Sequence, residues 1–508
     1  MKDKIIIYQD LALYSFGLSK SLQEMHDCDL YTILDVPDKI NNFFQKQHIV
    51  KYVKTWFLYD HISQKMRKPD LEYLSKIEEK YGIELWKLAY NDRIFYKYNA
   101  LYKFTTDEVL FIIEQECKFF ESILDEIKPD FAIFGLTNNI RNHIFYELCK
   151  AKGVKVLMII SGRVGDKLII SQNDNSIDYL DKQDYSNENI RTIDELKSYL
   201  YNKKIYDNVI TRNTFLKSKL DAIKAGINFF IFSSNSNLKT HYTYYGRKKY
   251  KVFFYTICMS LKKRYRSFFI NKNFTRDLGD EKFIFFPLIV EPERSLLIDA
   301  PFHTNLIELI THIVKSLPIG YKLYVKEHPT MDVRDWRSVS FYKQIMSLPN
   351  VKIIHTSMPS AEILQKCSLV ITIGSSAGLE AAFYGKNTIT FVNTVYSTLK
   401  SVLLLKDIHD LPKSIRKSLQ TNMDFTDLSR FVNILDKNSF DFDLQIFNNA
   451  VHKELFFSGF LSDVEIKESQ MRSLLNRYDK ILKNLASEHI KKIKQHKEYE
   501  LKTKNQNI

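Results

Sequence analysis

The fold of this chain is decided by two neighbouring stretches, LPIGYKLYVKEHPT (317–330) and SLPNVKIIHTSMPSAEILQKCSLVITIGSSAGLEAAFYGKNTITFV (347–392). They contain three short runs rich in β-branched and aromatic residues, YKLYV, VKII and LVITI, which polar or small residues and then helical patterns follow. This alternation predicts parallel strands joined by crossover helices. Because ligands of such open sheets bind just past the carboxyl ends of the strands, the residues at these exits are the first candidates for a site.

The turn after LVITI is the most informative exit. Gly374, Ser375 and Ser376 lead into a helical segment that Gly385 ends. The first N–H groups of such a helix have no partner within it and, together with the helix dipole, favour an anion such as a phosphate. Glu380 lies one turn further along the same face, within reach of a ribose hydroxyl. The same residues also fit an ordinary helix start, with Ser376 as the N-cap and Glu380 as a favourable charge.

The exit after YKLYV carries Lys326, His328 and Pro329. A histidine here could hydrogen-bond a phosphate and stabilise the charge that develops on a leaving group. A surface loop whose histidine caps a backbone carbonyl explains the same residues. Because both exits belong to one α/β unit, we favour a shared anion site.

Six segments of the chain resemble the capsule-polysaccharide biosynthesis family. A lone His-Pro pair is a weak motif, but this ordered set is specific to the family, and the similarity is strongest over 281–396. The segments are YGIELWKLAYNDRIFY (81–96), KAKGVKVLMIISGRVGDKLIIS (150–171), FFPLIVEPERS (285–295), VKEHP (325–329), PNVKII (349–354) and ITIGSSAGLEAAFYGKNTITF (371–391).

The resemblance implies an α/β chain of the GT-B type, with two Rossmann-like domains facing a cleft. It implies a glycosyltransferase that moves a sugar from a nucleotide-sugar donor to a capsular or surface polysaccharide or a lipid-linked acceptor. The family includes β-Kdo transferases, so a CMP-sugar such as CMP-Kdo is favoured over a UDP-sugar. We expect a reaction that needs no metal and no cofactor, with these residues at the donor: Lys326, His328, Pro329, Gly374, Ser375, Ser376 and Glu380.

A catalytic base or nucleophile is expected near the anomeric carbon of the donor. His328 is one candidate, and Glu291 and Glu293 in the loop after the strand 282–286 are two more. Two glutamates that flank a proline also fit a plain surface loop, and acids of the N-terminal half, such as Asp10, remain alternatives.

The N-terminal half is predicted to form the other Rossmann-like domain. KIIIY (4–8) is a buried-type strand, and DFAIFGLTNN (130–139) and VKVLMII (154–160) bracket a helix, as in a further strand–helix–strand unit. Asn138 and Arg163 follow these strands and are candidates for the acceptor. An arginine fork binds two oxygens of a carboxylate or phosphate, although a surface salt bridge explains Arg163 equally well.

Asp92 and Arg93 follow an apolar, tryptophan-containing helical pattern and complete the acceptor candidates. Helix-end charges or an exposed ion pair explain them as well, and a structural role is compatible with the resemblance at 81–96.

Residues 246–274, GRKKYKVFFYTICMSLKKRYRSFFINKNF, contain nine Lys or Arg and no acidic residue, with aromatic side chains between them. Such a segment can lie on an anionic membrane leaflet. It can equally bind an anionic glycan or be a solvated helix face.

The pattern predicts four parts of the chain. They are an acceptor-side Rossmann-like domain (1–175), a polar loop and basic helical insertion (176–280), a nucleotide-sugar-binding Rossmann-like domain (281–425) and a helical tail that could cross back to the first domain (426–508). In the tail the apolar stripe ends near residue 485, so the last residues are expected to be frayed or to form a basic tail.

A net charge of +14 favours an anionic partner, here a nucleotide sugar, an anionic glycan or lipid-linked acceptor, or an anionic membrane surface. No nucleic-acid motif is present, so nucleic acid is not expected as a partner. The opening residues lack a signal peptide, and no apolar run approaches the roughly 20 residues of a membrane span. A cytoplasmic protein, peripheral on the membrane face, is therefore expected.

Two other functions fit the same sequence. One is a different reaction on the same fold, by a sugar-nucleotide epimerase or a polyol-phosphate transferase. The other is a non-catalytic glycan- or membrane-binding assembly factor, which the basic segment supports and which predicts no nucleotide binding.

Overall fold

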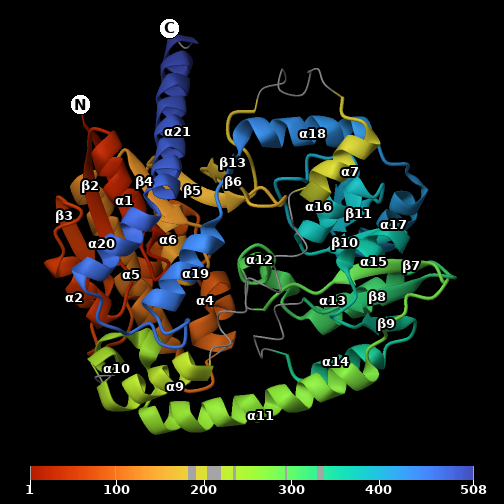
Figure 1. The fold of residues 1–508 in the computed structure, drawn as a ribbon, viewed down its shortest axis with the longest axis horizontal. Coiled ribbons are helices and arrows are strands. Elements are labelled where there is room, and N and C mark those ends of the chain that lie inside the picture. Colours follow the sequence, from red (N-terminus) through yellow and green to blue (C-terminus); the bar gives the residue numbers. More distant parts are fainter. Residues whose placement is uncertain are drawn as a thin grey trace.

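The computed structural model of the 508-residue chain describes residues 2–97, 99–180, 190–202, 219–232, 236–291, 294–328 and 337–506. Two lobes lie side by side, each built around one mainly parallel sheet with helices on its faces (Figure 1). The predicted α/β architecture, two Rossmann-like domains in the GT-B manner, is confirmed.

The sheet of the N-terminal lobe has the order β13-β6-β5-β4-β1-β2-β3. From β5 to β3 its neighbours are parallel, whereas β6 and β13 pair antiparallel at one edge. Ile5, Ile6 and Ile7 are fully buried because helices cover both faces of this sheet. The strands are β1 (Asp3–Gln9), β2 (Cys28–Leu34), β3 (Lys54–Phe57), β4 (Phe131–Gly135), β5 (Lys155–Ser161), β6 (Lys167–Ser171) and β13 (Phe440–Asp441).

The sheet of the C-terminal lobe is parallel throughout, in the order β12-β11-β10-β7-β8-β9. The order reverses beside β7 and β10, so this is the point at which a ligand site is expected. The strands are β7 (Phe283–Pro287), β8 (Lys322–Lys326), β9 (Val351–Ile354), β10 (Leu369–Thr372), β11 (Thr388–Thr390) and β12 (Val402–Leu404).

Helices connect the strands within each lobe. In the N-terminal lobe they are α1 (Tyr14–Met25), α2 (Asp38–Lys46), α3 (Leu71–Tyr81), α4 (Leu85–Asn91), α5 (Thr106–Ile127) and α6 (Ile140–Ala151). In the C-terminal lobe they are α12 (Arg294–Leu297), α13 (Leu306–Ser316), α14 (Val339–Met346), α15 (Ser360–Lys366), α16 (Ser376–Phe383), α17 (Leu411–Gln420) and α18 (Phe425–Asn438).

The chain returns to the N-terminal lobe through β13 and three helices, α19 (Leu444–Glu454), α20 (Glu468–Arg477) and α21 (Asp479–Gln506). α21 packs along α1 so closely that a Cβ on Gly17 would lie 2.7 Å from a methyl group of Leu482. The expected fraying of the last residues is wrong: α21 continues to Gln506 because Ile493 and His496 are buried against the lobe.

The insertion between the lobes is helical where it is described. α7 (Ile193–Asn202) stacks Tyr199 on Phe383 of α16. α9 (Lys219–Ile227), a π-helical turn η5 (Asn228–Phe232) and α10 (Ser236–Thr240) lie beneath the N-terminal lobe, and α11 (Lys249–Asn273) runs along the bottom of the molecule to the other lobe (Figure 1).

Irregular segments precede two of the helices. Residues 61–70 contain no helix, and α3 begins only after the Asp70 cap. α13 begins at Leu306, because Pro301 starts a 3₁₀ turn and Asn305 supplies the N-cap.

Candidate functional site

A cavity of about 400 Å³ lies where the carboxyl ends of the two sheets meet. From the N-terminal lobe its walls follow β4 and β5, and from the C-terminal lobe they follow β10 and β11. The described lining residues are Arg93, Leu136, Asn138, Ile160, Ser161, Arg163, Asp174, Asn175, Arg294, Ser295, Asp299, Gly374 and Val392–Val395. The structure therefore brings together four of the residues predicted from sequence, Arg93, Asn138, Arg163 and Gly374.

Arg163 supplies a cation to this cavity. It follows β5 in the left-handed backbone region, at φ +64°, and its N–H donates to the Ser161 hydroxyl at 3.1 Å. In the part of the chain that the structure describes, no hydrogen bond or ion pair engages its guanidinium. The surface salt bridge that the sequence left open is thus not formed, and the guanidinium is available to an anion.

Arg93 and Asp92 hold the exit of β4. The Arg93 guanidinium donates to the Asn138 carbonyl at 2.5 Å. The buried Asp92 carboxylate accepts the N–H groups of Ile94 and Ile140, at 2.7 and 3.0 Å, and so fixes the start of α6. Asp92 is therefore a structural residue, whereas Arg93 and Asn138 also face the cavity.

The turn after β10 is the part of the C-terminal lobe that was predicted best. Gly374 has φ +76°, and a Cβ there would lie 2.6 Å from Val392 and 3.0 Å from Thr394. The turn therefore depends on glycine for its backbone conformation and for its contact with the residues after β11.

Ser375, not Ser376, is the N-cap of α16, and its side chain makes no capping hydrogen bond. Its hydroxyl lies 2.8 Å from the Thr372 hydroxyl instead. The Ser376 hydroxyl donates to Glu380 at 2.8 Å. The interpretation of Ser376 as an N-cap is thus wrong, and neither serine side chain caps the first turn of α16.

Lys326 is the last residue of β8. It is buried, and its ammonium donates to the Ser360 hydroxyl at 2.9 Å. Burial lowers the pKa of Lys326 to about 8, while the carboxylate of Glu380 acts in the opposite direction. Lys326 and Glu380 therefore form one electrostatic unit next to the start of α16.

His328 is not among the described residues that line the cavity. Its N–H donates to the carboxylate of Glu327 at 2.8 Å. Glu327 forms a buried ion pair with Arg337 and accepts the Tyr342 hydroxyl at 2.7 Å. Glu291, a predicted catalytic residue, lies 3.6 Å from the same arginine. These contacts anchor the exits of β7 and β8, while Glu293 and Pro329 lie outside the described residues.

The sequence interpretation missed the ion cluster that joins the lobes. Arg294, buried at the start of α12, pairs with Asp299 of its own lobe and with Asp174 of the other, and its Nε donates to Thr137 at 3.2 Å. Burial raises the pKa of Asp299, which Arg294 partly offsets. Asn393 and Thr394 were also missed, although they follow β11 as the strand-exit rule requires.

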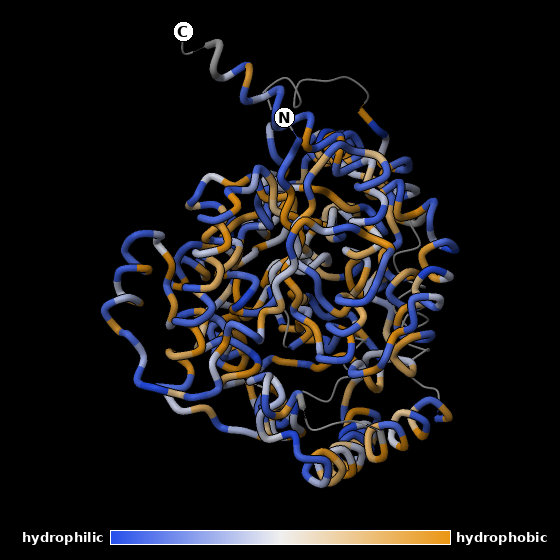
Figure 2. Tube along the Cα trace, turned by 90° about the vertical axis from the view of Figure 1, so that its left-hand side faces the viewer, coloured by the Kyte–Doolittle hydropathy of each residue, from blue (hydrophilic) through white to orange (hydrophobic). Residues whose placement is uncertain are grey.

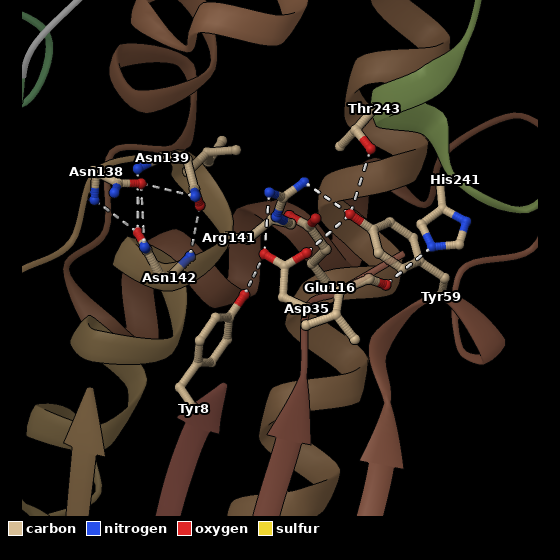
Figure 3. A network of polar contacts seen from close by, with 12 residues as sticks. Tyr8, Asp35, Tyr59, Glu116, Asn138, Asn139, Arg141, Asn142, His241 and Thr243 are labelled. Carbon is tan, nitrogen blue, oxygen red and sulfur yellow. Dashed lines mark hydrogen bonds and ion pairs between the residues drawn. The ribbon is translucent and has the colours of Figure 1, made fainter. Parts of the chain in front are cut away.

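A second polar network closes the rest of the carboxyl edge of the N-terminal sheet (Figure 3). Arg141 of α6 pairs with Asp35, after β2, at 3.1 Å. Asp35 also accepts the hydroxyls of Tyr8 and Tyr59, each at 2.9 Å. The hydroxyl of Tyr242, in the segment after α10, accepts a hydrogen bond from the Arg141 guanidinium at 3.0 Å. The insertion thus covers the exits of β1–β3, and the open part of this edge lies at β4 and β5.

Two Asp-x-Asp runs occur in the sequence, but neither lines the cavity. Asp27 and Asp29 lie at the amino end of β2, on the opposite edge of the sheet. Asp441 pairs with Lys167, and Asp443 caps α19. Among the described residues, no group of three or more His, Cys, Asp or Glu side chains is arranged to hold a metal ion.

Residues 193–399 match the family model described as capsule polysaccharide biosynthesis protein. The resemblance predicted from sequence is confirmed over this part of the chain. No curated protein sequence matches the chain.

Several solved structures are similar in fold. The UDP-GlcNAc 2-epimerase of Methanocaldococcus jannaschii is 12% identical, with 86% of this chain and 100% of that chain covered and a TM-score of 0.23. The β-Kdo 2,7-transferase KpsC of Thermosulfurimonas dismutans is 12% identical over 62% and 79% of the two chains, with a TM-score of 0.29. A KpsC structure from the same organism, the β-Kdo 2,4-transferase, is 12% identical, with 60% of this chain and 79% of that chain covered and a TM-score of 0.31. Values this low say nothing about the reaction of this chain.

Proposed function

We propose that this chain belongs to the capsule polysaccharide biosynthesis family and is a glycosyltransferase, which transfers a sugar from a nucleotide-sugar donor to a capsular or surface polysaccharide or a lipid-linked acceptor. The observation that carries the proposal is that Arg163 and Gly374, which begins the turn into α16, line one cavity between the lobes. A guanidinium that no described residue engages, from one lobe, and a helix start from the other can hold the same anion.

In this proposal the donor phosphate lies between Arg163 and the first turn of α16. The N–H groups of that turn and the Ser375 hydroxyl donate to it, and Glu380 with Ser376 binds the ribose. Of the three arginines that line the cavity, we assign only Arg163 to the donor, together with one helix start. This set suits a single phosphate, so a CMP-sugar such as CMP-Kdo is the favoured donor. The reaction needs no metal in this scheme.

Leaving-group stabilisation is the main catalytic contribution, because positive charge and N–H groups are already in place where the phosphate gains negative charge. Arg163 takes the part that the sequence assigned to His328. We propose Asp299 as the base that takes the proton from the acceptor hydroxyl. Asp299 lines the cavity, and burial raises the pKa of its carboxyl group. Glu291, held beside Arg337, has a positioning role.

The first test is nucleotide binding, measured as thermal stabilisation of the whole chain by CMP, CDP, UDP and GDP. A nucleotide at 100 times its Kd stabilises a protein by about 2.7 kcal/mol. Arg163→Gln should weaken binding of the best nucleotide by about tenfold or more, the usual range for a charge-assisted hydrogen bond. The matched control is Arg416→Gln on α17, whose guanidinium contacts only the Pro412 carbonyl among the described residues. Equal affinities of the two variants would contradict the assignment.

The second test separates transfer from epimerisation. A transferase leaves the sugar of its donor unchanged when no acceptor is supplied, whereas an epimerase converts the nucleotide sugar alone. Incubation of the protein with CMP- and UDP-sugars, followed by chromatography of the products, distinguishes the two. Conversion without any acceptor would overturn the proposed reaction but leave the nucleotide site intact.

A further inference from the structure

One face of α11 carries large apolar side chains that are exposed. They recur every three or four residues, so on a helix of 3.6 residues per turn they lie above one another. Their exposed fractions run from 42% at Ile257 to 65% at Phe268. The buried residues of this helix, Arg266 and Ile270, lie on the opposite face. We call the exposed set the apolar stripe: Tyr250, Phe254, Ile257, Leu261, Tyr265 and Phe268.

Cations flank the apolar stripe on both sides. Lys251 and Lys262 lie along one flank and Arg264 along the other, as the helical spacing requires. The whole segment 246–274 contains no acidic residue. A second copy of this face would bring like charges together, whereas a surface of anionic headgroups over apolar chains complements both the stripe and its flanks.

A second row of exposed apolar side chains lies on neighbouring elements. It runs along α9 and η5, which contact the start of α11, where Lys249 donates to the Phe230 carbonyl at 2.9 Å and Phe230 packs on Phe253 at 5.8 Å. In Figure 2 hydrophobic positions recur at the lower edge of the molecule, where Figure 1 places these helices. The second row is Leu220, Ile223, Ile227 and Ile231.

A cavity of about 490 Å³ lies between these helices. Apolar side chains such as Phe229, Val252 and Phe253 line much of it. Residues 460–463 form its other wall, and its described lining includes no side chain of either apolar row, so the cavity is not part of the exposed apolar face.

We propose that α11, with α9 and η5, lies in the plane of an anionic lipid bilayer and docks the protein on it. Exposed apolar patches of this extent mark interaction surfaces, and the combination of an apolar stripe with basic flanks is that of an interfacial helix. The described part of the chain contains no helix long and apolar enough to cross a membrane, so the attachment is lateral. The inference is independent of the reaction at the cavity.

The experiment is flotation of the full-length protein with vesicles at low ionic strength. Wild-type protein should bind phosphatidylcholine vesicles that contain phosphatidylglycerol and bind pure phosphatidylcholine far more weakly. The charge variant Lys251→Gln/Lys262→Gln/Arg264→Gln should bind the anionic vesicles about 100-fold more weakly, because each cation near such a surface contributes roughly fivefold. The stripe variant Phe254→Ser/Leu261→Ser/Phe268→Ser should bind the anionic vesicles at least about tenfold more weakly than wild type.

The matched control replaces equally exposed apolar residues away from α11, as Val53→Ser/Leu71→Ser/Ile319→Ser, and should bind as wild type does. Nucleotide affinity should be unchanged in all variants, which separates this inference from the proposed reaction. Three results would overturn it: wild-type protein that ignores anionic vesicles, a control that loses as much binding as the stripe variant, or stripe-dependent self-association by light scattering without vesicle binding.

Discussion

At the scale of single residues, Glu116 is a buried carboxyl group whose burial is only partly compensated. It is fully buried in α5 and accepts a hydrogen bond from the Tyr242 hydroxyl at 2.6 Å through one oxygen. The other oxygen has no hydrogen-bond partner among the residues that the structure describes. Burial raises the pKa of Glu116 to about 8, although Arg141 nearby lowers it in part. The network of Figure 3 thus contains an acid that is protonated at neutral pH.

The pKa of Glu116 predicts how stability depends on pH. In the unfolded chain the pKa of Glu116 is near 4.5, so the carboxyl group loses its proton above that pH. The folded protein keeps the proton up to about pH 8. The free energy of unfolding therefore falls as the pH rises from about 4.5 to about 8. Glu116→Gln, which can still accept from Tyr242, should therefore exceed wild type by more than about 1 kcal/mol at pH 9 and lose that advantage at pH 5. Thermal unfolding at the two pH values measures this.

A neighbouring glutamate on the same helix provides the control. Burial alone would raise the pKa of Glu114, but hydrogen bonds from Lys118 and from the Asp70 N–H lower it, and Arg67 pairs with it. Glu114→Gln should therefore destabilise the protein at pH 9. If both variants shift the melting temperature in the same direction at pH 9, the protonated state of Glu116 is wrong.

At the scale of elements, the turn after β10 could be predicted because its signals are local. A buried strand, a glycine, small polar residues and a helix occur within one run of sequence, and the structure places them as expected. Arg294 with Asp174, 120 positions away, and Arg141 with Asp35 could not be predicted, because nothing local marks either pair. The role of Ser376 was misassigned because α16 begins one residue earlier than expected. Ser376 is therefore its first helical residue, and its hydroxyl bonds Glu380 one turn further on.

The Gly374 turn can be tested by comparison with another glycine. Gly374→Ala forces a side chain into the left-handed region and against Val392, whereas Gly320→Ala, at φ +87°, meets no atom within 4 Å. Both should lose about 1 kcal/mol from backbone strain, and Gly374→Ala should lose roughly 1–3 kcal/mol more from overpacking. Chemical denaturation gives both values, and equal losses would show that the close approach to Val392 is unimportant. Only Gly374→Ala should weaken nucleotide binding.

At the scale of the whole molecule, both chain segments and side-chain contacts join the two lobes. β13 and the helices after it return to the first lobe, α11 spans both, and Arg294 joins their facing edges. The first two are covalent consequences of the chain path. The Arg294 cluster differs because it lies in the wall of the cavity and connects Asp174 and Thr137 of one lobe with Asp299 of the other. It therefore contributes to the alignment of the cavity walls that carry Arg163 and Gly374.

Substitutions that remove the charges of this cluster should show separately how it affects the stability of the protein and the alignment of the lobes. Arg294→Met leaves two carboxylates unpaired in the cavity wall and should destabilise the protein by roughly 3 kcal/mol. Adding Asp174→Asn and Asp299→Asn removes both charges, so the triple variant should regain most of the melting temperature. It still lacks the bridge between the lobes, so its radius of gyration by solution scattering should exceed that of wild type and return towards it when nucleotide binds. A triple variant as compact as wild type, with undiminished nucleotide affinity, would show that the lobes are aligned without Arg294.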